Sequence, residues 1–289
     1  MPERSPMERL EAMLGELPSP EFRQRLRFDL VKEIKMTTAT TLPTVVPYIA
    51  VPQAEELGAF IQQAFGAQGG FLGTGSEGGL HGQYVIGDGV VMIGGGAAWR
   101  HVKPRRASLH VYVPDADAAY RRAMEAGAKS LGEPSDRPYG DREAAVEDPT
   151  GNQWFIGTLR GRTTPAGTHD VNVTLFVPGA PDYLDFLGRA FGAEEVARHV
   201  SPQGQVIHAE ARIGDSIVEV GETRVEWPAN PTGIFLSMED CDSAYERAVK
   251  AGAEAVMPPT DRPFGRTATV GDAAGNQWYI TQRLTSRDR

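Results

Sequence analysis

The sequence is poor in the features that mark several protein classes. Its 289 residues include one cysteine, Cys241, which excludes an internal disulfide and makes the cytoplasm the expected compartment. It has no run of 18 apolar residues to cross a membrane, and residues 1–35 lack the apolar core of a signal peptide. Positive charge is also scarce: 29 Lys and Arg against 38 Asp and Glu give a net charge of −9, which disfavours a broad nucleic-acid-binding surface.

Glycine and proline, in contrast, are plentiful, and most of the chain repeats. The 33 glycines and 21 prolines indicate many turns between short elements. Phe65-Gly66-Ala67 recurs as Phe191-Gly192-Ala193, and Gly151-Asn152-Gln153-Trp154 recurs as Gly275-Asn276-Gln277-Trp278, with the landmarks between them in the same order. We therefore predict two copies of one domain, over residues 41–160 and 168–285, preceded by a helical arm over residues 1–40.

Each copy contains two rounds of a strand, a helix and further strands. In copy one a β-branched stretch at 44–51 precedes an amphipathic helix over Ala54–Phe65 that Gly66 would end. The second round begins at 108–113, and its helix would be capped by Asp115. The prediction is an α+β protein of four βαβββ modules.

These motifs, in this order and present twice, resemble the vicinal oxygen chelate superfamily and its PhnB-like branch. That superfamily includes glyoxalase I, extradiol dioxygenases and bleomycin resistance proteins. The residues that carry the resemblance are Val46-Pro47-Tyr48-Ile49, Ile213-Gly214-Asp215-Ser216, Val113–Tyr120 and Asp148–Trp154. The resemblance implies tandem domains whose modules pair as open β-barrels around cavities. It does not select one function, because the superfamily includes both enzymes and non-catalytic binders.

Enzymes of that superfamily usually hold a divalent metal with His, Glu or Gln at set strand positions. The resemblance places those positions here on Val46, Met92, Ser108, Phe155, Asn172, Glu219, Gly233 and Tyr279. Only Glu219 is a good ligand, and a shift of two residues along the Ser108 strand adds His110. We therefore expect no metal or other cofactor, with a weakly bound divalent metal as the alternative.

Two module pairings remain open, and they decide whether a catalytic pair exists. If modules pair across the copies, Glu219 and His110 share a polar cavity and could move a proton. If modules pair within a copy, the two side chains lie in different cavities. His110 could also be a structural histidine, and Glu219 could reach solvent at a strand end. Glu219 and His110 are accordingly the candidate catalytic residues.

Strand alternation from the same positions predicts which side chains would contact a ligand. Arg142 and Arg266, after equivalent turns, could meet an anionic group at a cavity rim or could be surface arginines paired with carboxylates. Trp154 and Trp278 should face the helices as core residues, and Cys241 should be an inert position, since Ala116 is its counterpart. The predicted ligand-binding residues are Tyr48, Met92, Ser108, Phe155, Asn172, Thr174, Phe235, Tyr279, Arg142 and Arg266.

Three functional expectations follow. The first is a metal-independent protein that binds a small, partly aromatic molecule, such as an antibiotic or a metabolite, in its cavities. The second is a glyoxalase-like isomerase or lyase that uses Glu219 and His110. The third is a non-catalytic protein that docks a partner through the helical arm, whose helices could also join two chains as a homodimer.

Overall fold

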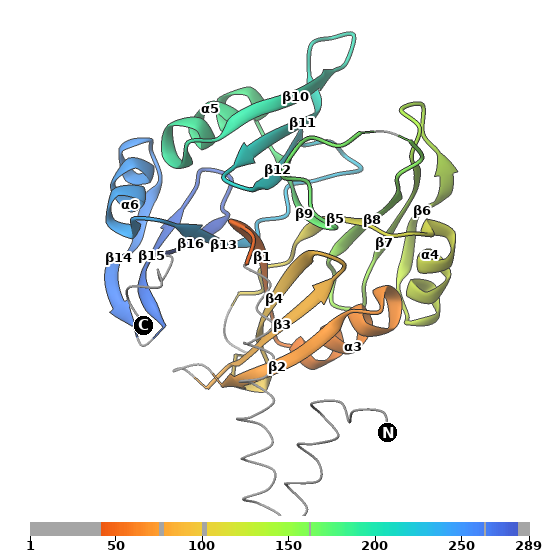
Figure 1. Ribbon diagram of the computed structural model, residues 1–289, viewed down its shortest axis with the longest axis horizontal. Coiled ribbons are helices and arrows are strands. Elements are labelled where there is room, and N and C mark those ends of the chain that lie inside the picture. The colour runs from red at the N-terminus through yellow and green to blue at the C-terminus, as the bar shows by residue number, and fades with distance from the viewer. Residues whose placement is uncertain (1–41, 75–77, 100–102, 162, 263, 283–289) are drawn as a thin grey trace, which may run out of the picture. The chain divides into compact units, whose positions relative to one another are not determined.

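The computed structural model describes residues 42–74, 78–99, 103–161, 163–262 and 264–282 (Figure 1). The predicted helical arm lies outside these residues. Copy one contains β1 (Val45–Val51), α3 (Ala54–Phe65), β2 (Gln68–Thr74), β3 (Leu80–Ile86), β4 (Gly89–Gly95), η1 (Ala97–Trp99), β5 (Ser108–Tyr112), α4 (Ala116–Glu125), β6 (Lys129–Asp136), β7 (Arg142–Glu147) and β8 (Gln153–Thr158). Copy two contains β9 (Val171–Val177), α5 (Ala180–Phe191), β10 (Glu194–Val200), β11 (Val206–Ile213), β12 (Ser216–Glu222), β13 (Gly233–Met238), α6 (Cys241–Lys250), β14 (Glu254–Arg262), β15 (Gly265–Gly271) and β16 (Gln277–Gln282).

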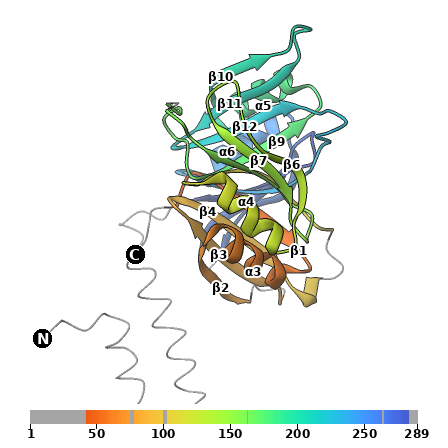
Figure 2. The ribbon, with the colours of Figure 1, turned by 90° about the vertical axis from the view of Figure 1, so that its right-hand side faces the viewer.

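The described strands form two eight-stranded sheets, and each sheet takes half of its strands from each copy (Figures 1 and 2). Sheet A has the order β14-β15-β16-β13-β1-β4-β3-β2, and sheet B has the order β10-β11-β12-β9-β5-β8-β7-β6. The copies meet at the antiparallel pairs β1–β13 and β5–β9, where Val46 lies opposite Phe235 and His110 lies opposite Asn172. The modules therefore pair across the copies, and the sheets are open rather than closed barrels.

The helices keep the two modules of each copy together. Helix α3 packs on α4, and α5 packs on α6. In each copy, however, the strands of the first module belong to one sheet and the strands of the second module belong to the other. Helix α3 has its predicted limits, and α4 begins directly after Asp115, as predicted. Gly66 ends α3 in the left-handed conformation, and the Asp115 side chain caps α4 by accepting from the Ala118 N–H.

A buried turn explains why the Gly-Asn-Gln-Trp motif recurs. The Asp148 carboxylate accepts hydrogen bonds from the backbone N–H groups of Thr150 and Asn152 and from the indole Nε1 of Trp154, at 2.7–3.1 Å. The indole then packs against Phe60 and Phe65 of α3 and is fully buried. Asp272 and Trp278 repeat the arrangement in copy two, at 2.9 Å. Both tryptophans are thus core residues, as predicted.

The Gly-Asp hairpin turns join the two sheets. Asp88, between β3 and β4, accepts from the Asp170 backbone N–H at 2.7 Å, and Asp170 accepts from the Asp88 N–H at 3.0 Å. In the second hairpin Asp215 accepts from the Thr44 N–H at 2.6 Å. His169 bridges both turns, because its ring nitrogens lie 3.2 Å from an Asp88 carboxylate oxygen and 2.8 Å from the Asp215 carbonyl oxygen.

Strands β2 and β6 were not placed by the sequence patterns. Both are sheet-edge strands, with partly or fully exposed residues throughout. Glycines in β2 and Pro134 in β6 remove the alternation that marks a half-buried strand, and each strand contains a register shift. Within the described part of the chain, no helix is long and apolar enough to cross a membrane.

Candidate functional site

The face of sheet B that points away from its helices, called here inner face B, brings the two candidate catalytic residues together. On β5, Leu109 and Val111 are fully buried in the core, so alternation directs Ser108, His110 and Tyr112 to inner face B. His110 Nδ1 lies 2.9 Å from Glu219 Oε1 on β12, although the two residues come from different copies. Their exposed fractions are 8% and 4%, so the pair is shielded from solvent.

The Glu219 carboxylate is held as an anion. Burial alone would raise its pKa, but the charge and hydrogen bond of His110, the charge of His208 and the Thr174 hydroxyl together lower the pKa to about 2. Thr174 Oγ1 donates to the second carboxylate oxygen of Glu219 at 2.9 Å. Glu219 is therefore ionised at neutral pH and a weak base, and its chemistry is to orient and stabilise a proton on His110.

A second carboxylate, Glu143 on β7, faces His110 from the other side. Its Oε1 lies 3.9 Å from His110 Nε2, and its Oε2 accepts from Arg137 Nε at 3.1 Å and from the Tyr139 hydroxyl at 2.7 Å. The sequence patterns pointed to the neighbouring Arg142 and not to Glu143. The available signal was alternation, since Ala145 on the same strand lies opposite Phe155, a predicted ligand-binding residue.

A second histidine–carboxylate contact lies on β11, the strand next to β12. His208 Nε2 is 3.3 Å from Glu210 Oε1, and Glu210 is paired with Glu219 in the strand register. Burial lowers the His208 pKa, but the hydrogen bond to Glu210 and the charges of Glu219 and Glu210 exceed that effect, so the pKa is raised. Inner face B thus carries a connected set of histidines and carboxylates.

Aromatic rings lie beside this charged set. Phe155 on β8 and Phe176 on β9 are 5.9 Å apart, and the Trp227 ring lies 4.8 Å from Phe155 and stacks on Phe176 at 5.8 Å. Trp227 belongs to the β12–β13 connection, which also places Asn230 Nδ2 3.5 Å from Ser108 Oγ. Trp227 was not among the predicted ligand-binding residues, because a connection has no periodicity to indicate which way a side chain points.

The corresponding face of sheet A, called inner face A, carries a cluster of aromatic rings. Tyr48 lies 5.2 Å from Tyr279 and 5.7 Å from His81 between ring centroids, and its hydroxyl is 3.3 Å from His81 Nδ1. Met92 lies opposite Tyr48 in the register, and Phe235 lies opposite Tyr279. The predicted residues therefore separate into an apolar set on sheet A and a polar set on sheet B.

Sequence comparison is consistent with this architecture. The Glyoxalase/Bleomycin resistance protein/Dioxygenase superfamily matches at residues 40–156 and again at 171–280, which together cover most of the chain. The chain belongs to this superfamily.

Several relatives within the superfamily are similar to this chain. A protein from Mycobacterium bovis is 32% identical over 120 residues, which span 37% of this chain and 79% of the relative. The anthracycline biosynthesis protein DnrV of Streptomyces peucetius is 27% identical over 194 residues, which span 63% of this chain and 68% of the relative. The crystal structure of glyoxalase I from Zea mays has a TM-score of 0.65 at 14% identity, covering 83% of this chain and 92% of that one. The last likeness concerns the fold alone.

The superfamily's metal does not fit the donors that the described residues offer. Among the described residues, no group of three or more His, Cys, Asp or Glu side chains could hold a metal ion. Both Glu219 oxygens accept hydrogen bonds or an ion pair from His110 and Thr174. The Asn172 amide is bound to the backbone of His169, with its oxygen accepting at 3.1 Å and its nitrogen donating at 2.6 Å. Inner face B also carries Glu143, His208 and Glu210, but no three of its described side chains converge as the ligand group that a superfamily metal site requires.

The two predicted arginines lie away from both inner faces. Arg142 donates to both carboxylate oxygens of Asp117 on α4, at 2.7 Å each, and Arg266 makes the equivalent pair with Asp242 on α6. These are the paired surface arginines of the alternative interpretation, and the structure does not bring them to His110. Cys241 is buried at the start of α6, where burial and then the charge of Asp242 raise its thiol pKa to about 11.

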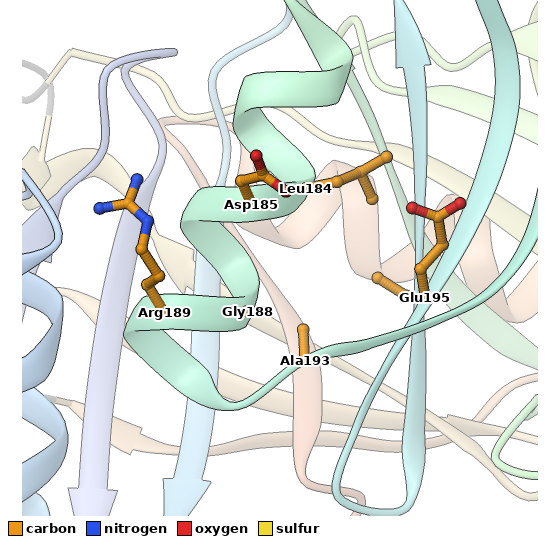
Figure 3. A pocket seen from close by; sticks show the side chains of 7 residues that line it. Leu184, Asp185, Gly188, Arg189, Ala193 and Glu195 are labelled. Carbon is orange, nitrogen blue, oxygen red and sulfur yellow. The ribbon is translucent and has the colours of Figure 1, made fainter.

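A surface hollow of about 460 Å³ lies on the other side of sheet B (Figure 3). It is lined by Leu184, Asp185, Gly188 and Arg189 of α5 and by Ala193, Glu195 and Ala211. Its position between α5 and the edge strand β10 separates it from His110 and Glu219. A second hollow, of about 390 Å³, lies beside the start of α4 and includes Arg142 and Arg160. Neither hollow is lined by His110, by Glu219 or by an aromatic side chain of the two inner faces.

Proposed function

We propose that this chain binds a small, partly aromatic molecule, an antibiotic or a related metabolite, on the inner faces of its sheets and without a metal. The observation that carries the proposal is the position of Phe155, Phe176 and Trp227 beside the His110–Glu219 pair. Rings supply contact area and orientation, and the buried charged pair supplies directional hydrogen bonds, which is the usual composition of a small-molecule site.

The exposure of the rings suits this role. Phe155, Phe176 and Trp227 are each half-buried, so part of each ring remains for a ligand, whereas the core tryptophans are fully covered. DnrV, a relative over most of this chain, is an anthracycline biosynthesis protein. An anthracycline is a planar polycyclic aromatic compound with polar substituents, and it is therefore the first ligand class to test.

The test is isothermal titration of the full chain with an anthracycline. We expect Trp227→Leu to raise the Kd at least tenfold, or about 1.4 kcal/mol, because a stacking surface is lost. Val225→Ala is the matched control in the same connection, since Val225 is 96% exposed, and it should leave the Kd unchanged. Equal Kd values for the wild type and Trp227→Leu would contradict anthracycline binding on inner face B.

The metal-free part of the proposal has its own test. Elemental analysis of the purified chain should find less than a tenth of an equivalent of Zn, Ni, Mn or Fe. Near-stoichiometric metal that survives dialysis against a chelator would contradict it.

A second candidate function is proton transfer by a glyoxalase-like isomerase or lyase. The 2.9 Å contact between His110 Nδ1 and Glu219 Oε1 favours it, because a carboxylate that orients an imidazole is a common acid–base arrangement. His110 is then the group that exchanges the proton, and the ionised Glu219 orients it. With any substrate found, His110→Gln should abolish turnover, whereas full turnover in that variant would exclude this candidate. The arm-docking and homodimer hypotheses concern residues outside the described part of the chain and remain predictions.

A further inference from the structure

Inner face A has a hydrogen-bonded ring cluster that differs chemically from inner face B. Tyr48 is its centre: the Tyr48 ring stacks on His81 with 22° between the ring planes and lies at 59° to Tyr279. Its hydroxyl meets His81 Nδ1 at 3.3 Å, and the Tyr279 hydroxyl donates to Gln277 Oε1 at 3.1 Å. The three side chains come from β1, β3 and β16, so both copies contribute.

Two glycines make room for these rings. A Cβ on Gly94 would lie 2.6 Å from the Tyr48 hydroxyl oxygen, and a Cβ on Gly233 would lie 2.9 Å from Cε2 of Tyr279. Both distances are too short for a real side chain. The absence of a side chain at Gly94 and Gly233 therefore lets the two tyrosine rings pack closely against the sheet.

The hydrogen-bond roles follow from the protonation states. Burial, followed by the neighbouring Tyr279, raises the Tyr48 pKa to about 12, and burial lowers the His81 pKa, so both groups are neutral at pH 7. A neutral phenol is the better donor and a neutral imidazole the better acceptor, so the Tyr48 hydroxyl donates to His81 Nδ1. His81 then carries its ring hydrogen on Nε2, which makes that nitrogen a donor.

We propose that inner face A is a second ligand site that takes an uncharged, planar aromatic compound whose carbonyl oxygen accepts a hydrogen bond from His81 Nε2. Tyr48 and Tyr279 supply the apolar contact surface. Their rings and the His81 ring remain half-buried rather than fully covered. The inference rests on the proposed function in that it takes the inner faces as ligand sites, but it assigns the two faces to different ligands.

The electrostatic contrast between the faces supports this assignment. On inner face B the ring set adjoins three buried carboxylates, those of Glu143, Glu210 and Glu219, which favour a ligand with donor or cationic groups. On inner face A the hydrogen bonds of Tyr48, His81 and Tyr279 go to one another and to a glutamine amide. An uncharged ligand loses little hydration there, whereas a cationic ligand would meet the like charge of Arg105, which acts on Tyr279 and opposes the rise that burial causes in its pKa.

The test uses coumarin, an uncharged bicyclic lactone, and 2H-chromene, which has the same rings without the carbonyl group. Titration of the full chain should give one equivalent of bound coumarin, with a Kd at least tenfold lower than that of 2H-chromene. His81→Phe keeps a ring but removes the donor, and it should raise the coumarin Kd tenfold while leaving the 2H-chromene Kd within twofold. Tyr120→Phe on α4 is the matched control and should change neither value.

The outcomes separate this inference from the proposed function. Equal binding of coumarin and 2H-chromene to the wild type, or no coumarin binding, overturns the inference without any variant that must fold. A coumarin Kd unchanged in His81→Phe also overturns it. Trp227→Leu reports on inner face B. Coumarin binding that is weakened by Trp227→Leu and not by His81→Phe would place the ligand on inner face B and would overturn the inference. Failure of the anthracycline titration alone leaves the coumarin result standing.

Discussion

His110 lies between two carboxylates that have different surroundings. Glu219 is buried and bound by Thr174, whereas Glu143 is held by Arg137 and Tyr139, and both of these side chains reach solvent. One carboxylate therefore fixes the imidazole from inside the sheet, and the other connects it to the surface. The pair His110–Glu219 could be proposed from the sequence as one of two alternatives. Alternation along β7 indicated the face of Glu143, but its contact with His110 depends on strand register.

Glu219→Gln should lower the free energy of unfolding at pH 7 by about 2 kcal/mol, because the amide keeps the shape but loses the ion pair. A folded-state pKa of about 2 against the ordinary 4.5 means that Glu219 contributes stability above pH 4.5, and that this contribution is lost as the pH falls towards 2. The difference between wild type and variant should therefore shrink over that range. Urea unfolding at pH 7, 4 and 3 measures it.

Glu246→Gln, at an exposed position on α6, is the control for this series and should stay within about 0.5 kcal/mol of the wild type at every pH. A Glu219→Gln difference that stays constant from pH 7 to pH 3 would contradict the ion pair.

Cys241 should be unreactive in the folded chain. It is fully buried and its thiol pKa is raised to about 11, so very little thiolate exists at pH 8. Reaction with a chromogenic disulfide at pH 8 should be at least a hundredfold slower than in 6 M guanidinium, and Cys241→Ala should cost about 1 kcal/mol or less, as Ala116 stands at the equivalent position. Rapid labelling under native conditions would show that the start of α6 opens.

The Asp-x-x-Gly-Asn-x-Trp turn precedes the last strand of each copy, β8 or β16, and its tryptophan packs that strand against a helix. Asp148 and Asp272 accept backbone, amide and indole hydrogens in the same pattern, but Asp272 also accepts from the Tyr183 hydroxyl at 2.6 Å. The sequence motif predicted a turn and a core tryptophan. It did not reveal that the aspartate accepts a hydrogen bond from the indole, because that contact requires the turn to fold back on its own strand.

Replacing the turn aspartate should be among the most destabilising single changes. Asp148→Ala leaves the buried Trp154 Nε1–H and two backbone N–H groups without their acceptor, and we expect a loss of about 3 kcal/mol in unfolding free energy. Tyr183→Phe removes one donor to Asp272 and should cost about 1 kcal/mol. Urea unfolding followed by tryptophan fluorescence compares them, and a smaller effect of Asp148→Ala than of Tyr183→Phe would contradict this account.

At the scale of the whole molecule, both sheets contain strands of both copies, whereas the helices of each copy pack on one another. Periodicity, capping residues and repetition predicted the modules, because these are local properties of the chain. They could not choose between pairing within and across copies, since β1 or β5 can in principle pair with the first strand of any other module. Contacts between distant residues decide it: Val46 with Phe235, His110 with Asn172, and the hairpin aspartates with the opposite sheet. The position of Trp227 beside Phe155 depends on that pairing, whereas Glu143 and His110 belong to the same module and lie together in either pairing.

This pairing predicts how the chain behaves when it is divided between the two copies, into residues 1–162 and 163–289. Each half would contain two half-sheets with the strand edges of β1 and β5, or of β9 and β13, uncovered. Exposed strand edges pair with other chains, so each half alone should self-associate or aggregate. Co-expressed halves should instead form a 1:1 complex that regains the ligand binding and near-ultraviolet circular dichroism of the intact chain. Light scattering after size exclusion measures the mass, and two monomeric halves that each unfold cooperatively and do not bind one another would show that the modules pair within copies.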